Sequence, residues 1–114
     1  MAKVVLIACV SQKREHSAPA RDLYISSLFT KAYHYAQTLQ PDAPYILSAE
    51  HGLVHENTIL EPYNKAMHSL TRTERIAWAE QVLAALRTKH NLATDQFVFL
   101  AGKLYRREIG RAHV

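Results

Sequence analysis

Val4-Val5-Leu6-Ile7-Ala8 runs directly into Cys9-Val10-Ser11-Gln12-Lys13 near the start of the chain, and this junction decides the fold. A run of apolar, mostly β-branched residues without polar alternation is typical of a strand buried on both faces, as in a parallel sheet covered by helices. Ligands of open α/β sheets bind beyond the carboxyl ends of the strands. The first strand therefore leads straight into a candidate site, since a thiol, a hydroxyl, an amide and an ammonium follow it.

Size and charge set broad limits on the kind of protein. The chain has 114 residues, a single cysteine and a formal net charge of +4. This length suits one domain with one core. A lone cysteine forms no internal disulfide, and neither a signal peptide nor an apolar run of membrane length is evident, so we expect a cytoplasmic protein with no membrane partner. The mild positive charge permits contact with nucleic acid or phosphorylated ligands without requiring it, and the oligomeric state stays open.

The end of the chain, Ile109-Gly110-Arg111-Ala112-His113-Val114, looks like a translated sequencing adapter. We expect a single α/β domain over residues 1–108. Residues 109–114 are either native chain or a non-native tail, and in the second case the natural domain is truncated at its C-terminal end.

A helix is predicted after the first strand, which covers residues 3–8. The helix spans residues 24–40, and Pro41 ends it. Its apolar face has spacings of three and four and consists of Leu28, Phe29, Ala32, Tyr33, Ala36 and Leu39. A short buried strand over residues 45–48 follows, and then a connection over residues 49–70 that is too long for an idle turn.

A second helix and a third strand complete the predicted elements. Thr71 and Glu74 form a capping box that opens the helix, which ends near residue 89. Its inward face is predicted to consist of Ile76, Ala77, Trp78, Val82, Leu83 and Leu86. The third buried strand covers residues 97–100.

The alternation of strands and helices predicts an α/β fold with three layers, in which a small parallel sheet is flanked by helices with right-handed crossovers. If the three strands are neighbours, their carboxyl ends lie at one edge of the sheet. Residues 9–13, 48–52 and 101–103 should then converge there and form the site.

The loop after the first strand carries candidate ligand-binding groups. Ser11 and Lys13 suit an anion, because a hydroxyl, a cation and exposed backbone amides on one short loop resemble a phosphate cradle. The loop contains no glycine, so it is not a Walker loop. Cys9 is either a nucleophile or a small packed residue beneath the loop.

The start of the first predicted helix offers further candidates. Asp22 is a plausible N-cap, and it is also a candidate catalytic carboxylate. Tyr24 and Ser27 lie three residues apart and should share a face of the first turn. Their hydroxyls either bind a ligand or line the loop.

The segment after the second strand places Ser48, Glu50 and His51 at the same edge. Gly52 permits a positive φ or a close backbone approach. His51 and His55 are four residues apart, but Gly52 argues against a helix there, and a metal site needs more ligands. We therefore expect neither a metal nor a cofactor.

Two more segments complete the candidate site. In Glu61-Pro62-Tyr63 the proline fixes a turn, so Glu61 could activate water or orient a sugar hydroxyl; the alternative is a surface glutamate beside a packed tyrosine. After the third strand, Gly102 would let a ligand approach the backbone, and Lys103 or Arg106 could contact a phosphate. The alternative there is a loop with solvated cations.

The order of these motifs resembles that of the bacterial and phage family called domain of unknown function 6884. The matching segments are Cys9-Val10-Ser11-Gln12-Lys13, Ala18-Pro19-Ala20-Arg21-Asp22-Leu23-Tyr24, Ser27-x-Phe29, Ile46-Leu47-Ser48-Ala49-x-x-Gly52-Leu53-Val54, Glu61-Pro62-Tyr63 and Leu100-Ala101-Gly102-x-x-Tyr105-Arg106. The Gly-Leu-Val and Glu-Pro-Tyr segments also resemble the YaaA-type peroxide-stress proteins, which are associated with DNA binding. More loosely, the Cys, Lys and Tyr-x-x-Ser pattern is similar to a domain of archaeosine synthase, which modifies a deazaguanine base in tRNA.

These resemblances imply a nucleic acid or nucleobase partner, and the family of unknown function brings no settled activity. Two departures from the family pattern matter. His51 stands where relatives often have an aromatic residue. The pattern also continues past Arg106, where this chain has residues 109–114.

The leading hypothesis is a domain that acts on a nucleobase or nucleotide within nucleic acid, by N-glycosidic cleavage or base modification. The candidate carboxylates are Glu61, Glu50 and Asp22. The groups expected to bind base and phosphates are Cys9, Ser11, Lys13, Tyr24, Ser27, Ser48, Gly52, Tyr63, Gly102, Lys103 and Arg106. The alternatives are a non-catalytic DNA-binding stress or phage-defence protein and a small-molecule nucleotide-binding enzyme or sensor, so whether the chain is an enzyme stays open.

Overall fold

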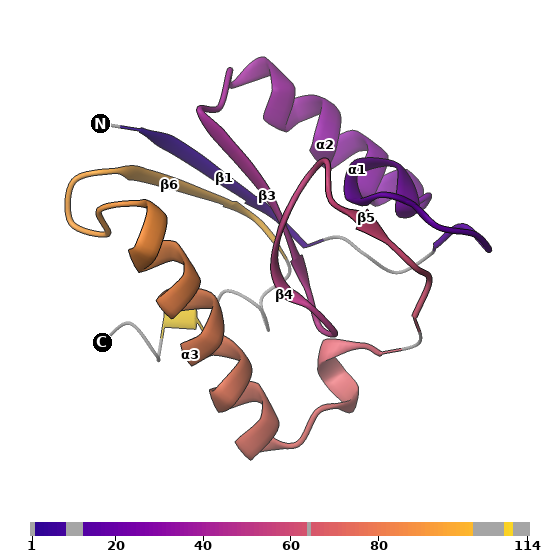
Figure 1. Ribbon diagram of the computed structural model, residues 1–114. Coiled ribbons are helices and arrows are strands. Elements are labelled where there is room, and N and C mark those ends of the chain that lie inside the picture. Colours follow the sequence, from indigo (N-terminus) through magenta and orange to yellow (C-terminus); the bar gives the residue numbers. More distant parts are fainter. Residues whose placement is uncertain (1, 9–12, 64, 102–108, 111–114) are drawn as a thin grey trace.

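A four-stranded sheet between two helical layers forms the centre of the molecule (Figure 1). The computed structural model describes residues 2–8, 13–63, 65–101 and 109–110. The sheet has the order β4-β3-β1-β6, with β1 at Lys3–Ile7, β3 at Ala43–Ser48, β4 at Gly52–His55 and β6 at Gln96–Leu100. The central β1 is parallel to both β3 and β6, whereas β4 is antiparallel to β3. The three predicted strands are therefore parallel neighbours, as expected.

The two long helices cover opposite faces of this sheet, α2 at Ser27–Thr38 on one face and α3 at Arg72–Lys89 on the other (Figure 1). Alternate side chains of β1 divide between the faces: Val4 and Leu6 belong to the core beneath α3, and Val5 and Ile7 to the core beneath α2. These four side chains are at most 1% exposed. The predicted three-layer α/β architecture is confirmed, because a strand buried on both faces needs a helix on each side.

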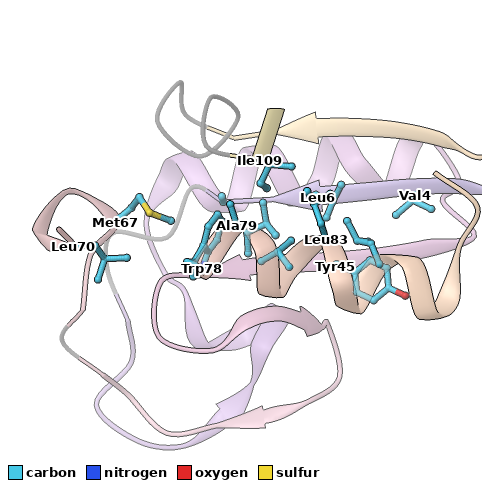
Figure 2. Close-up of a cluster of buried hydrophobic side chains, with 13 residues drawn as sticks. Val4, Leu6, Tyr45, Met67, Leu70, Trp78, Ala79, Leu83 and Ile109 are labelled. Atoms are coloured by element: carbon cyan, nitrogen blue, oxygen red, sulfur yellow. The ribbon is translucent and has the colours of Figure 1, made fainter. Parts of the chain in front are cut away.

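The core beneath α3 extends along the whole helix, as Figure 2 shows from Met67 and Leu70 at one end to Tyr45 and Val4 at the other. Trp78 is 5% exposed, and burying a side chain of that size contributes several kcal/mol. Ile109 packs into the same cluster and is 4% exposed.

The beginning of α3 matches the sequence prediction, but its inward face is rotated. Thr71 is the N-cap, and Thr71 and Glu74 form both hydrogen bonds of the capping box. Ala79 is buried beside Trp78, whereas Ile76 is 42% exposed and Ala77 is exposed. Placing Ile76 and Ala77 on the inward face was therefore wrong, because the contact face of α3 centres on the row through Ala79, Val82 and Leu86.

The first long helix begins later than the sequence predicts. Helix α2 starts at Ser27, and the Ser26 hydroxyl caps it by accepting a hydrogen bond from the Phe29 backbone N–H at 3.2 Å. Asp22 is therefore not the N-cap of this helix. Leu28, predicted to face inward, is 64% exposed, because the neighbouring Phe29 fills the core-facing position about 100° away around the helix.

Small elements occupy segments that were predicted as loops. The strands β2, Ala18–Pro19, and β5, Ile59–Leu60, form an antiparallel ribbon, with the short helix α1, Ala20–Leu23, directly after β2. A 3-10 turn, η1, spans Met67–Ser69. The predicted connection over residues 49–70 thus contains β4, β5 and η1. Among the described helices, none is long and apolar enough to cross a membrane.

Candidate functional site

The hydroxyl of Ser48 lies at the carboxyl end of β3 and organises the candidate site. Ser48 is fully buried, and its Oγ accepts hydrogen bonds from the backbone N–H groups of Glu50, at 3.2 Å, and His51, at 3.0 Å. These bonds fix the turn that leads into β4. The indole Nε1–H of Trp78 donates to the Ser48 carbonyl at 2.8 Å, which anchors the same turn to α3. The position of Ser48 is therefore held from both sides.

Two tyrosine hydroxyls extend this network. Ser48 Oγ donates to the Tyr63 hydroxyl at 2.9 Å, and the Tyr63 hydroxyl lies 2.7 Å from that of Tyr24. Burial raises the pKa of Tyr63, while the hydrogen bonds with Ser48 and Tyr24 act in the opposite direction. Because a tyrosine with a raised pKa is protonated at neutral pH, the Tyr63 hydroxyl can donate a proton to a hydrogen bond.

Lys13 places its ammonium against these rings. Its backbone forms an isolated antiparallel bridge with Tyr24, and its Nζ lies 4.3 Å from the Tyr63 ring centroid and 5.8 Å from that of Tyr24. Burial lowers the pKa of Lys13. In the part of the chain that the structure describes, no carboxylate forms an ion pair with Lys13. Aromatic faces rather than an opposite charge therefore compensate this partly buried cation.

Glu50 and His51 lie next to this group, which we call the Lys13–Tyr63 site and define as Lys13, Tyr24, Ser48 and Tyr63. The His51 ring packs edge-on to the Tyr63 ring, with 5.3 Å between centroids. The carboxylate of Glu50 lies 3.9 Å from Lys65 Nζ, and its charge contributes to the raised pKa of Tyr63. Of the three candidate carboxylates, Glu50 is therefore the one whose charge affects the pKa of Tyr63.

Three predicted site residues form no hydrogen bond with the described groups of the hydroxyl chain. Asp22 lies in α1, with its carboxylate 3.8 Å from Arg21 Nε. Glu61 is exposed, two residues before Tyr63, and Ser27 is exposed in the first turn of α2. The expectation that Tyr24 and Ser27 share a helical face was wrong, because Tyr24 precedes α2 in extended conformation.

The structure confirms the positive φ expected of Gly52, which is +75°. Gly52 starts β4 and pairs with Ser48 across the hairpin, so it closes the turn that carries Glu50 and His51. The predicted site residues Cys9, Ser11, Gly102, Lys103 and Arg106 lie outside the described residues. Within the described ranges, no group of three or more His, Cys, Asp or Glu side chains is placed to hold a metal ion.

Sequence reasoning missed two contributors to the site. Lys65 carries no sequence signal, because its proximity to Glu50 depends on the path of the 61–66 segment. Trp78 was predicted only as a core residue, although a buried indole N–H requires an acceptor. That requirement indicated a hydrogen bond, but the acceptor, Ser48, is known only from the fold.

The geometry defines an α/β domain with a lysine and a chain of three hydroxyls at the carboxyl end of its parallel strands. The chain belongs to the family of unknown function DUF6884, whose model matches residues 4–113. No curated protein and no solved structure matches the chain. The similarity to the YaaA-type proteins therefore stays a prediction.

Proposed function

We propose that the Lys13–Tyr63 site binds a nucleotide of nucleic acid and that the domain acts on the base of that nucleotide. The observation that carries this proposal is the Lys13 ammonium, partly buried and 4.3 Å from the Tyr63 ring centroid. A cation held by ring faces retains its charge for an incoming anion, and phosphate is the anion that a nucleotide supplies. The approaching phosphate would also restore the charge balance that burial disturbs.

The hydroxyl chain supports recognition of a base. The hydroxyls of Tyr24, Ser48 and Tyr63 are joined by hydrogen bonds of 2.7 and 2.9 Å. Hydroxyl groups both donate and accept, so they match the mixed donor and acceptor edge of a nucleobase. The Tyr63 and His51 rings offer aromatic faces beside them.

The reaction that we propose is hydrolysis of the N-glycosidic bond, with Glu50 as the base. Glu50 takes a proton from water, and the water oxygen forms a bond to the anomeric carbon. The bond from that carbon to the base nitrogen breaks, and the departing base keeps the electron pair and takes a proton from solvent. A carboxylate beside the sugar also stabilises the oxocarbenium-like transition state.

A second candidate is non-catalytic binding of nucleic acid through the same groups. The ion pair between Glu50 and Lys65, at 3.9 Å, favours this alternative, because a carboxylate engaged with a lysine is less available to water. Both functions require the same ligand and differ only in turnover.

Binding is tested by titrating the protein with a single-stranded oligonucleotide at several salt concentrations. The affinity should fall as salt rises, because phosphate contacts release counterions. Lys13→Met should weaken binding and lower the salt slope by about one unit. An affinity that is the same in wild type and Lys13→Met would rule out the proposed site.

Turnover is tested by comparing Glu50→Gln with Glu61→Gln, its matched control on an exposed position. We expect release of free base by wild type and by Glu61→Gln, and a loss of about 100-fold or more in Glu50→Gln with unchanged affinity. Binding without base release in wild type would select the non-catalytic alternative. Equal rates in Glu50→Gln and wild type would remove Glu50 from the mechanism.

A further inference from the structure

A second cleft adjoins the Lys13–Tyr63 site on the α2 side. It has a volume of about 360 Å³ and opens between the segments that contain α1 and the first turns of α2. A volume of this order falls within the range of small-molecule sites. Tyr24 lines this cleft and also belongs to the Lys13–Tyr63 site, so the two share a wall.

A row of aromatic rings connects the Lys13–Tyr63 site with the cleft. Tyr63 and Tyr24 have ring centroids 6.4 Å apart, Tyr24 and Phe29 are 5.3 Å apart, and Phe29 and Tyr33 are stacked at 6.0 Å. Phe29 and Tyr33 both line the cleft. The rings therefore form a continuous row from the first site to the cleft, in which Tyr24 and Phe29 are buried and Tyr33 is partly exposed.

The cleft contains two guanidinium groups that can pair with a phosphate. Arg14 and Arg21 both line it, together with Asp22 and His34. Arg14 Nε donates to the Asp22 carbonyl at 2.7 Å, and an Arg21 terminal N–H donates to the Asn57 side chain. These bonds orient both guanidinium groups. Two carboxylates lie near them, because Asp22 lines the cleft and Glu56 accepts a hydrogen bond at 3.3 Å from the hydroxyl of Tyr33, another lining residue.

An apolar surface lies next to these cations. Ile25 lines the cleft and is 48% exposed, although isoleucine is normally buried. The combination of arginines with apolar and aromatic side chains suits a nucleotide, whose phosphate pairs with a guanidinium and whose base stacks on a flat apolar face.

We infer that this cleft binds the nucleotide next to the one held at the Lys13–Tyr63 site, so that the ligand is a single strand of nucleic acid rather than a free nucleotide. The inference rests on the proposed function, because it assigns the neighbour of a nucleotide already placed there. A free mononucleotide fills one of two contiguous sites, whereas a strand fills both. A base in the cleft must also be unpaired, which excludes an intact duplex as the ligand.

The experiment measures the affinity of a nucleoside monophosphate and of a hexanucleotide by calorimetry, in deoxyribose and ribose series. The test variants are Arg14→Ala/Arg21→Ala and Ile25→Ala, whose exposed side chain can be shortened without opening the core. The matched control is Arg72→Ala/Arg87→Ala, which removes two exposed arginines of α3. Thermal unfolding of each variant verifies that it is folded.

In whichever sugar series binds, wild type should bind the hexanucleotide at least about ten-fold more tightly than the monophosphate. Arg14→Ala/Arg21→Ala should lose about ten-fold or more for the hexanucleotide, Ile25→Ala should lose less, and the monophosphate affinity should stay within about two-fold in both.

Equal affinities of wild type for the two ligands would overturn the inference, as would a hexanucleotide affinity of Arg14→Ala/Arg21→Ala equal to that of the control. Should Arg14→Ala/Arg21→Ala not fold, an Ile25→Ala affinity equal to wild type overturns it. Each of these results leaves the Lys13–Tyr63 site intact, whereas failure of the proposed function is seen separately, as a wild-type affinity in Lys13→Met.

Discussion

The two ends of the parallel sheet use the same kinds of side chain in opposite ways. At the amino end, His90 lies between the Tyr45 hydroxyl, 2.8 Å from its Nε2, and the Asp95 carboxylate, 3.7 Å from its Nδ1. The Asp95 carboxylate also accepts hydrogen bonds from the backbone N–H groups of Ala2 and Asn91, each at 2.9 Å. Every polar group named here has a partner from the chain itself, as expected of a cluster that stabilises the fold.

The carboxyl end also has a tyrosine at its centre, but among the described residues its lysine, Lys13, has no carboxylate partner. The Lys13 ammonium packs on the Tyr63 ring, and Tyr63 bonds to Ser48 and Tyr24. Burial lowers the pKa of Lys13, which means that folding leaves its charged form less stable than in water. Among the described residues, the charges of the amino-end cluster pair with one another, whereas the Lys13 ammonium packs against aromatic rings. This difference is why we propose the ligand site at the carboxyl end.

The largest expected effect is on oligonucleotide binding, when one lysine at each end of the sheet is replaced. Lys13 and Lys89 each have an ammonium near a tyrosine ring, at 4.3 Å from Tyr63 and 5.8 Å from Tyr45. Lys13→Met should weaken oligonucleotide binding by about 1.5–3 kcal/mol, the range for a hydrogen bond to a charged group. Lys89→Met removes one charge remote from the proposed site, so it should change the binding free energy much less. Calorimetry of both variants at one salt concentration measures the difference.

The next effect concerns the turn that positions Ser48. Gly52→Ala should lower the free energy of unfolding by about 1–2 kcal/mol, because φ is +75° there and an L side chain disfavours that region. The new Cβ would lie 3.7 Å from Val82, an ordinary contact, so crowding adds little. Urea unfolding provides the measurement.

Gln40 gives the matching control at the amino end, since its φ is +50°. Gln40→Gly should stabilise the fold by several tenths of a kcal/mol, because glycine tolerates this region at the end of a helix. Shifts of the same sign in Gly52→Ala and Gln40→Gly would contradict this account of the two turns.

Removing one hydroxyl at each end gives a smaller effect. Tyr63→Phe and Tyr45→Phe should each lower the free energy of unfolding by about 0.5–1.5 kcal/mol, since each loses hydrogen bonds within the chain. Only Tyr63→Phe should also weaken binding of the oligonucleotide. Weaker binding in Tyr45→Phe would show that the amino end is not purely structural.

The smallest effect is on the pH dependence of stability. Hydrogen bonds from the Ala2 and Asn91 backbone N–H groups lower the pKa of Asp95 in the folded protein. The contribution of Asp95 to stability is therefore complete well above its unfolded pKa, about 3.9, and is lost as the pH falls through the lower folded value.

Asp95→Asn should accordingly show a shallower fall in stability below about pH 5 than wild type. Urea unfolding at several pH values measures both. If the free energy of unfolding of Asp95→Asn falls with decreasing pH as steeply as that of wild type, Asp95 does not stabilise the fold in this way.

The parts of the fold that the sequence predicts are those set by local pattern. The run from Val4 to Ala8 has the apolar composition typical of a strand covered on both faces, and Thr71 with Glu74 specifies a helix start by spacing alone. Parallel order then follows from connectivity. These patterns involve residues that are close in sequence, so they can be recognised without knowledge of the fold.

The features that the sequence analysis predicted wrongly or missed depend on competition between nearby residues or on contacts between distant segments. Asp22 and Ser26 are both good caps, and Ser26 prevails because Tyr24 is drawn into an extended bridge with Lys13. Strand β4 was missed because its pairing with β3 relies on the turn at Gly52. The sequence identified Lys13, Ser48 and Tyr63 as separate candidates, but their contact depends on how the 61–63 segment folds back over the sheet.

The central claim is that nucleic acid binds at the carboxyl end of the sheet, and an NMR titration tests it most directly. Backbone amide shifts of the wild-type chain are followed as a single-stranded oligonucleotide is added. The account predicts that the largest changes cluster at Lys13, Tyr24, Ser48 and Tyr63. Changes centred on His90 and Asp95, or none at saturating oligonucleotide, would contradict it.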